Sequence, residues 1–107
     1  MARSESKRFK QQPLIVGTNI LEPLDVTNYT GVSVSIQNLP ATVGSMTLQA
    51  SNDQTNWTDI SSSTTALTAS GLDIINFPNL HVCHVRVKVV LAAGAGNYDL
   101  IMVAKER

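Results

Sequence analysis

Apolar and polar side chains alternate with a period of two over several short segments, which is typical of β-strands with one buried face. Residues 31–37 and 45–51 show the alternation most clearly. In both segments every second residue is apolar, and the residues predicted to face the core are Val32, Val34, Ile36, Met46, Leu48 and Ala50. No helical period competes over a useful length.

Turn-forming residues separate these runs at intervals of roughly 8–12 residues, as in sandwiches and barrels. The sequence therefore predicts an all-β fold, an antiparallel β-sandwich that is jelly-roll-like. The predicted strands cover residues 13–16, 24–26, 31–37, 45–51, 56–60, 65–68, 73–77, 81–91 and 97–104.

In the last two predicted strands, the side chains of both faces indicate what each face contacts. One face of residues 81–91 is polar in its middle, where Arg86 and Lys88 indicate a salt bridge or a partner's carboxylate. Residues 97–104 are apolar on both faces. One face belongs to the core, and the other, with Ile101 and Val103, is expected to be covered by the N-terminal segment, a loop or another subunit.

A chain of 107 residues is the size of one ordinary domain. Only 15% of its residues are charged, and the eight cations balance the eight anions. A formal net charge of zero gives copies of the chain little mutual repulsion, which favours association. It speaks against general nucleic-acid binding, which needs a basic excess.

The neutral total hides an asymmetry. Residues 1–10 carry four cations and one anion, so the remaining chain, with four cations and seven anions, has a net charge of minus three. This pattern predicts a basic N-terminal arm over residues 1–12, outside a sandwich domain over residues 13–107. Deleting residues 2–12 is expected to leave a folded body. The arm residues expected to bind a partner are Arg3, Lys7, Arg8, Phe9 and Lys10.

Candidate chemistry is sparse. His81, Cys83 and His84 have the spacing H-x-C-H, but alternation on a strand points His84 away from the other two. A lone cysteine cannot form an intrachain disulfide, and Cys83 is interpreted as a small buried hydrophobic residue. We find no signature of catalysis, and we expect no enzyme activity, metal site or cofactor.

No signal peptide or membrane-spanning segment is recognisable, so we expect synthesis in a cytoplasm and no membrane partner.

The most distinctive stretch is residues 51–60, where turn-forming residues surround the single tryptophan. Trp57 is interpreted as starting a strand and packing over a sheet edge as the largest core residue. The alternative is a carbohydrate-binding site in which the indole stacks on a sugar and neighbouring polar side chains bind its hydroxyls. Its candidate residues are Asn52, Asp53, Asn56 and Trp57.

This stretch, Leu48 to Asp53 followed by Asn56 to Ile60, together with the later strand Val85 to Val89, resembles small β-sandwich proteins of tailed-bacteriophage virions. In these proteins a strand ending in SND turns into a W-x-D strand, and an R-V-x-V strand precedes the last one. The resemblance covers roughly residues 24–104. The chain departs from the pattern at Gln54, where the turn usually has glycine.

The resemblance implies a non-enzymatic structural role without catalytic residues. The implied function is capsid decoration, in which the protein cements the lattice of the major capsid protein, commonly as a trimer whose arms clamp neighbouring subunits. An accessory protein of the tail or neck is the alternative within the same class. Both readings place the protein in the virion, assembled in the host cytoplasm.

Overall fold

A computed structural model describes residues 4–61, 63–77 and 80–105, which form strands, turns and loops with no helix. Since this part of the chain holds no helix, it holds no helical segment of membrane-spanning length. Its strands are β1 (Ser4–Leu14), β2 (Gly17–Ile20), β3 (Leu24–Asp25), β4 (Gly31–Gln37), β5 (Val43–Ser51), β6 (Thr58–Asp59), β7 (Thr65–Ala66), β8 (Leu72–Phe77), β9 (His84–Ala93) and β10 (Gly96–Lys105).

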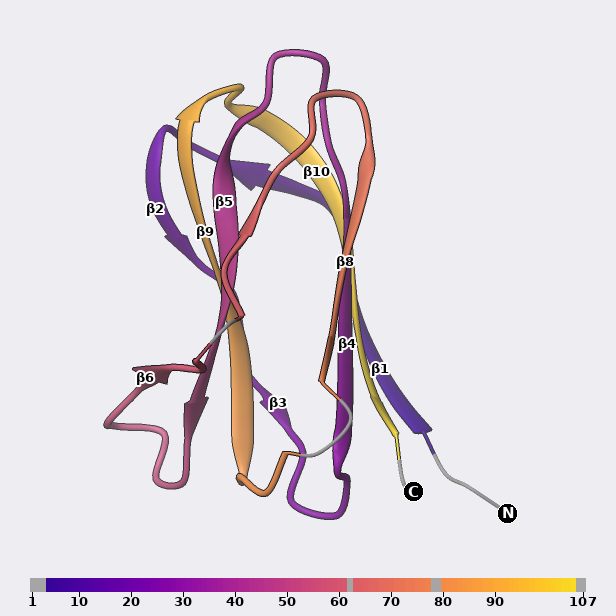
Figure 1. Ribbon diagram of the computed structural model, residues 1–107, viewed down its shortest axis with the longest axis vertical. Helices are drawn as coiled ribbons and strands as arrows, with labels where there is room; N and C mark the ends of the chain where they lie inside the picture. Colours follow the sequence, from indigo (N-terminus) through magenta and orange to yellow (C-terminus); the bar gives the residue numbers. More distant parts are fainter. Residues whose placement is uncertain (1–3, 62, 78–79, 106–107) are drawn as a thin grey trace.

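The strands form two antiparallel sheets packed face to face (Figure 1). Sheet A has the order β1-β10-β4-β8, and sheet B has the order β2-β9-β5-β6, with β3 also paired to β9 and β7 to β5. When β2 with β3 and β6 with β7 are each counted as one interrupted strand, both sheets have four strands in jelly-roll order. The predicted all-β sandwich of jelly-roll type is therefore confirmed.

The core lies between the sheets and consists of the residues that the alternation predicted. All six core-facing residues of the two clearest segments are at most 6% exposed. In β9 and β10 the buried positions again alternate, and Tyr98 lies at 0% exposure. Its buried hydroxyl donates to the Gly94 carbonyl at 2.6 Å and lies 2.7 Å from Thr42 Oγ1, so this polar group is satisfied inside the core.

Residues 4–12, expected to form a free arm, belong to the sheet instead. They make up most of β1, which pairs with β10 from Ser4 opposite Lys105 to Leu14 opposite Gly96. Phe9 is 8% exposed and packs in the core. The charged side chains made this strand unrecognisable from the sequence. An edge strand tolerates polar and charged residues on every side except the one that faces the core.

A bulge interrupts β1 between Phe9 and Gln12. Gln11 adopts a φ of 54°, and its backbone N–H donates to Asp99 Oδ1 at 2.9 Å. The extra residue lets the strand continue past the bulge with its register shifted. Because residues 4–9 and 12–14 both pair with β10, the cations of residues 7–10 lie on the sheet.

β9 begins three residues later than the sequence predicted. Residues 81–83 form a loop, and β9 starts at His84. Cys83 is therefore half-buried in a loop and does not continue the buried face of Val85, Val87 and Val89. The expectation of a buried Cys83 was wrong because Asn52 holds the backbone outside the ladder: its Oδ1 accepts the Cys83 N–H at 3.0 Å.

Candidate functional site

The outer face of sheet B carries a connected row of polar side chains, here called the polar ladder: Gln49, Asp59, Arg86 and Lys88. Arg86 Nε donates to Gln49 Oε1 at 2.8 Å, and Gln49 Nε2 donates to Asp59 Oδ1 at 2.8 Å. Lys88 Nζ completes the row at 3.1 Å from Asp59 Oδ1. These residues meet because β6, β5 and β9 are neighbouring strands. The salt bridge expected for this face is thus confirmed, and its carboxylate comes from the chain itself.

The polar ladder also determines the environment of Trp57. The Arg86 guanidinium carbon lies 4.1 Å from the centroid of the indole, within the range of a cation–π contact. The indole Nε1 donates to the Gln54 carbonyl at 3.2 Å, and the residue is half-buried. Hydrogen bonds from Gln49 and then Lys88 lower the pKa of Asp59. The preferred interpretation of Trp57, as the largest core residue at the start of a strand, was therefore wrong: β6 begins at Thr58, and Trp57 lies half-buried beside Arg86, outside the core.

The turn before Trp57 is organised around Asp53. One carboxylate oxygen, Oδ1, accepts the backbone N–H groups of Asn56 at 2.8 Å and Thr55 at 2.9 Å, and also the hydroxyl of Ser51 at 2.9 Å. The other oxygen accepts from Asn56 Nδ2 at 2.9 Å. Bonds from the Asn56 and Thr55 backbone are the main reason that the pKa of Asp53 lies far below its ordinary value.

Gln54 occupies the position where the phage proteins usually have glycine. Its φ of 60° lies in the left-handed region that favours glycine. Gln54 thus adopts a conformation that glycine adopts readily, and the Ser51 Oγ that accepts the Gln54 N–H at 2.9 Å helps to hold it.

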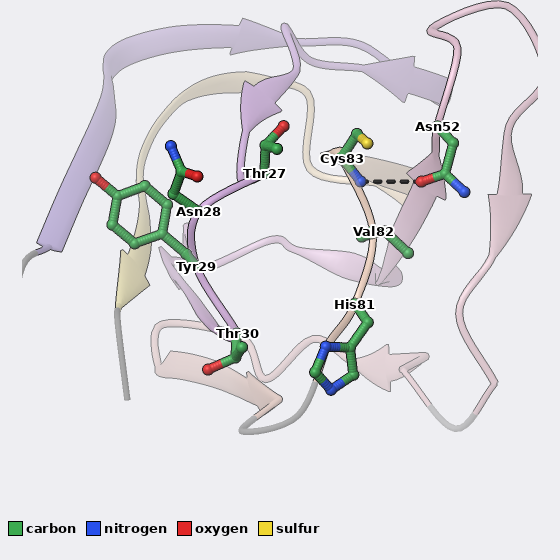
Figure 2. Close-up of a pocket in the computed structure, with 8 residues that line it drawn as sticks. All are labelled: Thr27, Asn28, Tyr29, Thr30, Asn52, His81, Val82 and Cys83. Carbon is green, nitrogen blue, oxygen red and sulfur yellow. Dashed lines mark hydrogen bonds between the residues drawn. The ribbon is translucent and has the colours of Figure 1, made fainter.

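A hollow of about 370 Å³ opens at one end of the sandwich (Figure 2). Residues 27–30 form one side and residues 81–83 the other, with Asn52 beyond Cys83. The described lining residues offer hydroxyl, amide, imidazole and phenol groups, and none of them is a carboxylate. Thr30 Oγ1 is buried without a hydrogen-bond partner in the described part of the chain. The lining residues are Thr27, Asn28, Tyr29, Thr30, Asn52, His81, Val82 and Cys83.

The candidate glycan-binding residues divide between this end and the turn. Asn52 lines both the hollow and an adjacent depression of about 230 Å³, which Asn56 also lines. Asp53 and Trp57 line neither and contribute to the turn and the polar ladder. Residues 27–30 were not recognised from the sequence, because their proximity to residues 81–83 arises from the packing of two loops distant in sequence.

The H-x-C-H residues do not converge. His84 Nε2 lies 3.9 Å from Asp25 Oδ2, whose pKa is lowered chiefly by the backbone N–H of Thr27. His81 is exposed in the preceding loop. Within residues 4–61, 63–77 and 80–105, no three His, Cys, Asp or Glu side chains form a group able to hold a metal ion.

The outer face of sheet A has a different chemistry. Small hydroxyl and branched apolar side chains occupy its middle, with Ser33 and Ser35 on β4 beside Val103 and Ile101 on β10. All four are half-buried, and neither β1 nor a described loop lies over them. β8 extends this face with Ile74, which is 58% exposed and pairs with Ser35. The covering expected for Ile101 and Val103 is thus not supplied by the described chain.

Of the predicted partner-binding residues, Arg8 and Lys10 remain exposed at the border of this face. They line a hollow of about 200 Å³ together with Asp99 and Ile101. Lys7 forms an ion pair with Glu22 at 3.1 Å, Phe9 is buried in the core, and Arg3 lies outside the described residues.

No protein-family model and no curated protein sequence matches the chain. Solved structures share its fold. The SPBc2 prophage-derived protein YomS has a TM-score of 0.69 and 15% identity, with 97% of this chain and 96% of that chain covered. The PBSX exported protein XepA has a TM-score of 0.70 and 11% identity over 92% of this chain and 36% of its own.

A carbohydrate-binding protein has the same architecture at lower structural similarity. Chitosan-binding module 1 of a chitosanase/glucanase from Paenibacillus sp. IK-5, as a V110M mutant, has a TM-score of 0.51 and 26% identity. The match covers 91% of this chain and 74% of that chain. The fold therefore occurs both in a prophage-derived protein and in a polysaccharide-binding module.

Proposed function

We propose that this chain is a non-enzymatic structural protein of a bacteriophage particle, which binds the lattice of the major capsid protein and stabilises the head. The uncovered outer face of sheet A is the observation that carries the proposal. Its centre is uncharged and composed of Ser, Ile and Val side chains, so it loses hydration at small electrostatic cost when a protein surface covers it.

Two further observations support this role. The chain and the prophage-derived YomS share their fold over nearly the whole length of both. Arg8 and Lys10 place cations at the border of the face, where exposed charges contribute to orientation and association rate more than to affinity. Many modest contacts on a repeating lattice would then hold the protein by multivalency.

The test uses phage heads that lack this protein and purified variants added back to them. Ser35→Glu places a charge at the centre of the face without removing core volume, and we expect binding to weaken about tenfold or more because that charge becomes buried. Thr18→Glu, an exposed change on sheet B, is the matched control and is expected to bind normally. Equal binding by both variants would contradict the proposed face.

The copy number in purified particles distinguishes the head from the alternative location. A head decoration protein is expected at a copy number comparable with that of the major capsid protein, and quantitative mass spectrometry measures it. A few copies per particle would place the protein in the tail or neck.

Carbohydrate binding is the second candidate, favoured by the likeness to the chitosan-binding module and by the hollow of Figure 2. The described residues that line the hollow include no carboxylate to pair with the ammonium groups of chitosan, and their chemistry fits neutral sugars better. We expect Asn28→Ala to abolish binding of neutral oligosaccharides on a glycan array if the hollow is the site. Loss with Trp57→Ala alone, in a folded protein, would instead locate binding at the indole.

A further inference from the structure

β8 is an edge strand that lacks the features by which proteins normally prevent strand pairing. It pairs with β4 in regular register, and no other described segment pairs with it. Leu72 and Ile74 are each 58% exposed and point to the outer face. The strand contains no proline and no cation, and its one charge, Asp73, accepts bonds from Asn38 Nδ2 at 2.6 Å and the Thr68 N–H at 2.7 Å.

The other sheet edges are protected. β1 carries Lys7, Arg8 and Lys10, a bulge at Gln11 and a proline at residue 13. On both sides of sheet B the outermost strands are only two to four residues long. Short strands, bulges, prolines and cations are the means by which natural sheets prevent edge-to-edge association. Among the described strands β8 alone presents a regular apolar edge, which is a template for another strand.

We propose that β8 pairs antiparallel with β8 of a second copy of this chain, about a two-fold axis at Ile74. Opposite residues of antiparallel strands share a face, so each outward residue must meet another outward residue. The register centred on Ile74 satisfies this condition: it places Ile74 opposite Ile74 of the second copy and Leu72 opposite Asn76. Centring the axis on Asp73 would instead oppose two like charges.

A second copy fits this edge for two reasons. The unpaired backbone groups of β8 need an extended strand, and a two-fold arrangement supplies one of identical length with apolar side chains in register. The formal net charge of zero adds little repulsion between copies. The two sheets A would then join into one continuous sheet with a shared outer face, so the contact enlarges the surface assigned above to the capsid. It does not depend on that assignment.

The test begins with the oligomeric state of the full chain, measured by sedimentation over a concentration series. We expect a monomer–dimer equilibrium that Ile74→Lys shifts at least about tenfold toward monomer, because two opposed ammonium groups repel each other. Ile20→Lys is the matched control, since Ile20 is a 44% exposed apolar residue on sheet B, and it is expected to leave the equilibrium unchanged.

Cross-linking tests the register in a Cys83→Ala background. Ile74→Cys is expected to form an intermolecular disulfide, because directly opposed residues have Cα atoms about 4.5–5.5 Å apart. Leu72→Cys alone is not, because the two copies of residue 72 would be about 13 Å apart. A mixture of Leu72→Cys and Asn76→Cys chains is expected to cross-link as a heterodimer.

Several outcomes would overturn the proposal. They are a monomer at every concentration, a dimer that Ile74→Lys does not weaken, equal cross-linking at residues 72 and 74, or a trimer such as the phage resemblance indicated without a disulfide at residue 74. If Ile74→Lys lost its fold by circular dichroism, the cross-linking pattern would decide. Because all these measurements use free protein, failure of head binding would leave them unaffected.

Discussion

Asp53 links one ionisable side chain to the geometry of a whole turn. Its carboxylate accepts backbone bonds from Thr55 and Asn56, and Ser51 accepts those of the residues before them. Gln54 can then adopt the left-handed conformation in which glycine is usual. The polar residues expected to bind a sugar thus form, in part, the internal support of the loop.

The charge of Asp53 predicts a pH-dependent stability. Its folded-state pKa lies below the unfolded value of about 3.9, so the stabilisation is complete above that value and is lost as the pH falls through the folded pKa. We expect Asp53→Asn to lower Tm by a few degrees at neutral pH, and the difference from wild type to shrink as the pH falls from about 4 to about 2. Thermal unfolding followed by circular dichroism measures this.

Glu22→Gln is the control for that experiment. It removes an exposed carboxylate whose ion pair with Lys7 lies at the surface and contributes little to stability. A Tm difference between wild type and Asp53→Asn that stayed constant with pH would show that the shape of the side chain, and not its charge, supports the turn.

Among the strands, β1 differs most from what its sequence predicted. It has the composition of a solvated tail, yet it covers one side of β10 and contributes Phe9 to the core. Residues 4 and 105 are opposite each other, so the two ends of the described chain lie side by side at this edge of sheet A (Figure 1). Because β1 pairs along its length with β10 and contributes to the core, it is part of the cooperative fold.

Deletion of residues 2–12 is therefore expected to destabilise the protein, in contrast to the expectation from the charge pattern. The deletion removes most of the β1 ladder and the Phe9 ring, and loss of a buried phenylalanine alone typically costs about 3–5 kcal/mol of unfolding free energy. That is a large part of the roughly 5–15 kcal/mol available to a small domain. Urea unfolding and size-exclusion chromatography should reveal an unfolded or aggregated product.

The double variant Arg8→Gln, Lys10→Gln is the control, since it removes two exposed charges and keeps the strand. It is expected to unfold at nearly the wild-type urea concentration. A deletion variant with wild-type stability would show that β1 is dispensable to the fold and would restore the view of residues 2–12 as an arm.

At the scale of the whole molecule, the outer faces of the two sheets differ in how their charged side chains are arranged. Sheet B carries a polar ladder in which Lys88 forms an ion pair with Asp59 and Arg86 donates a hydrogen bond to Gln49. Sheet A presents a face with an uncharged centre, bordered by the exposed charges of Arg8, Lys10 and Asp99. Charges that are already paired favour a solvated face, whereas an uncharged face of small residues favours contact with protein. The two sheets therefore have different expected partners.

Much of the fold could be predicted from local alternation. Val32, Val34 and Ile36 had to face inward, because a shift of one residue would expose the entire apolar stripe. Ile101 and Val103 were correctly identified as a second apolar stripe that requires an explanation. Arg86 and Lys88 indicated a salt bridge, and Asp59 provides it for Lys88.

Strand order, sheet edges and the end hollow could not be obtained in this way. Every residue except proline offers the same backbone N–H and C=O groups for pairing. The local sequence of a strand therefore does not show which other strand it pairs with. The sequence of β1 predicted a tail, and only the structure shows that it pairs with β10, about ninety residues away along the chain. The exposure of Ile74 likewise follows from the position of β8 at an edge. Alternation fixes which side chains point inward, whereas the packing of all strands together fixes which surfaces remain open to partners.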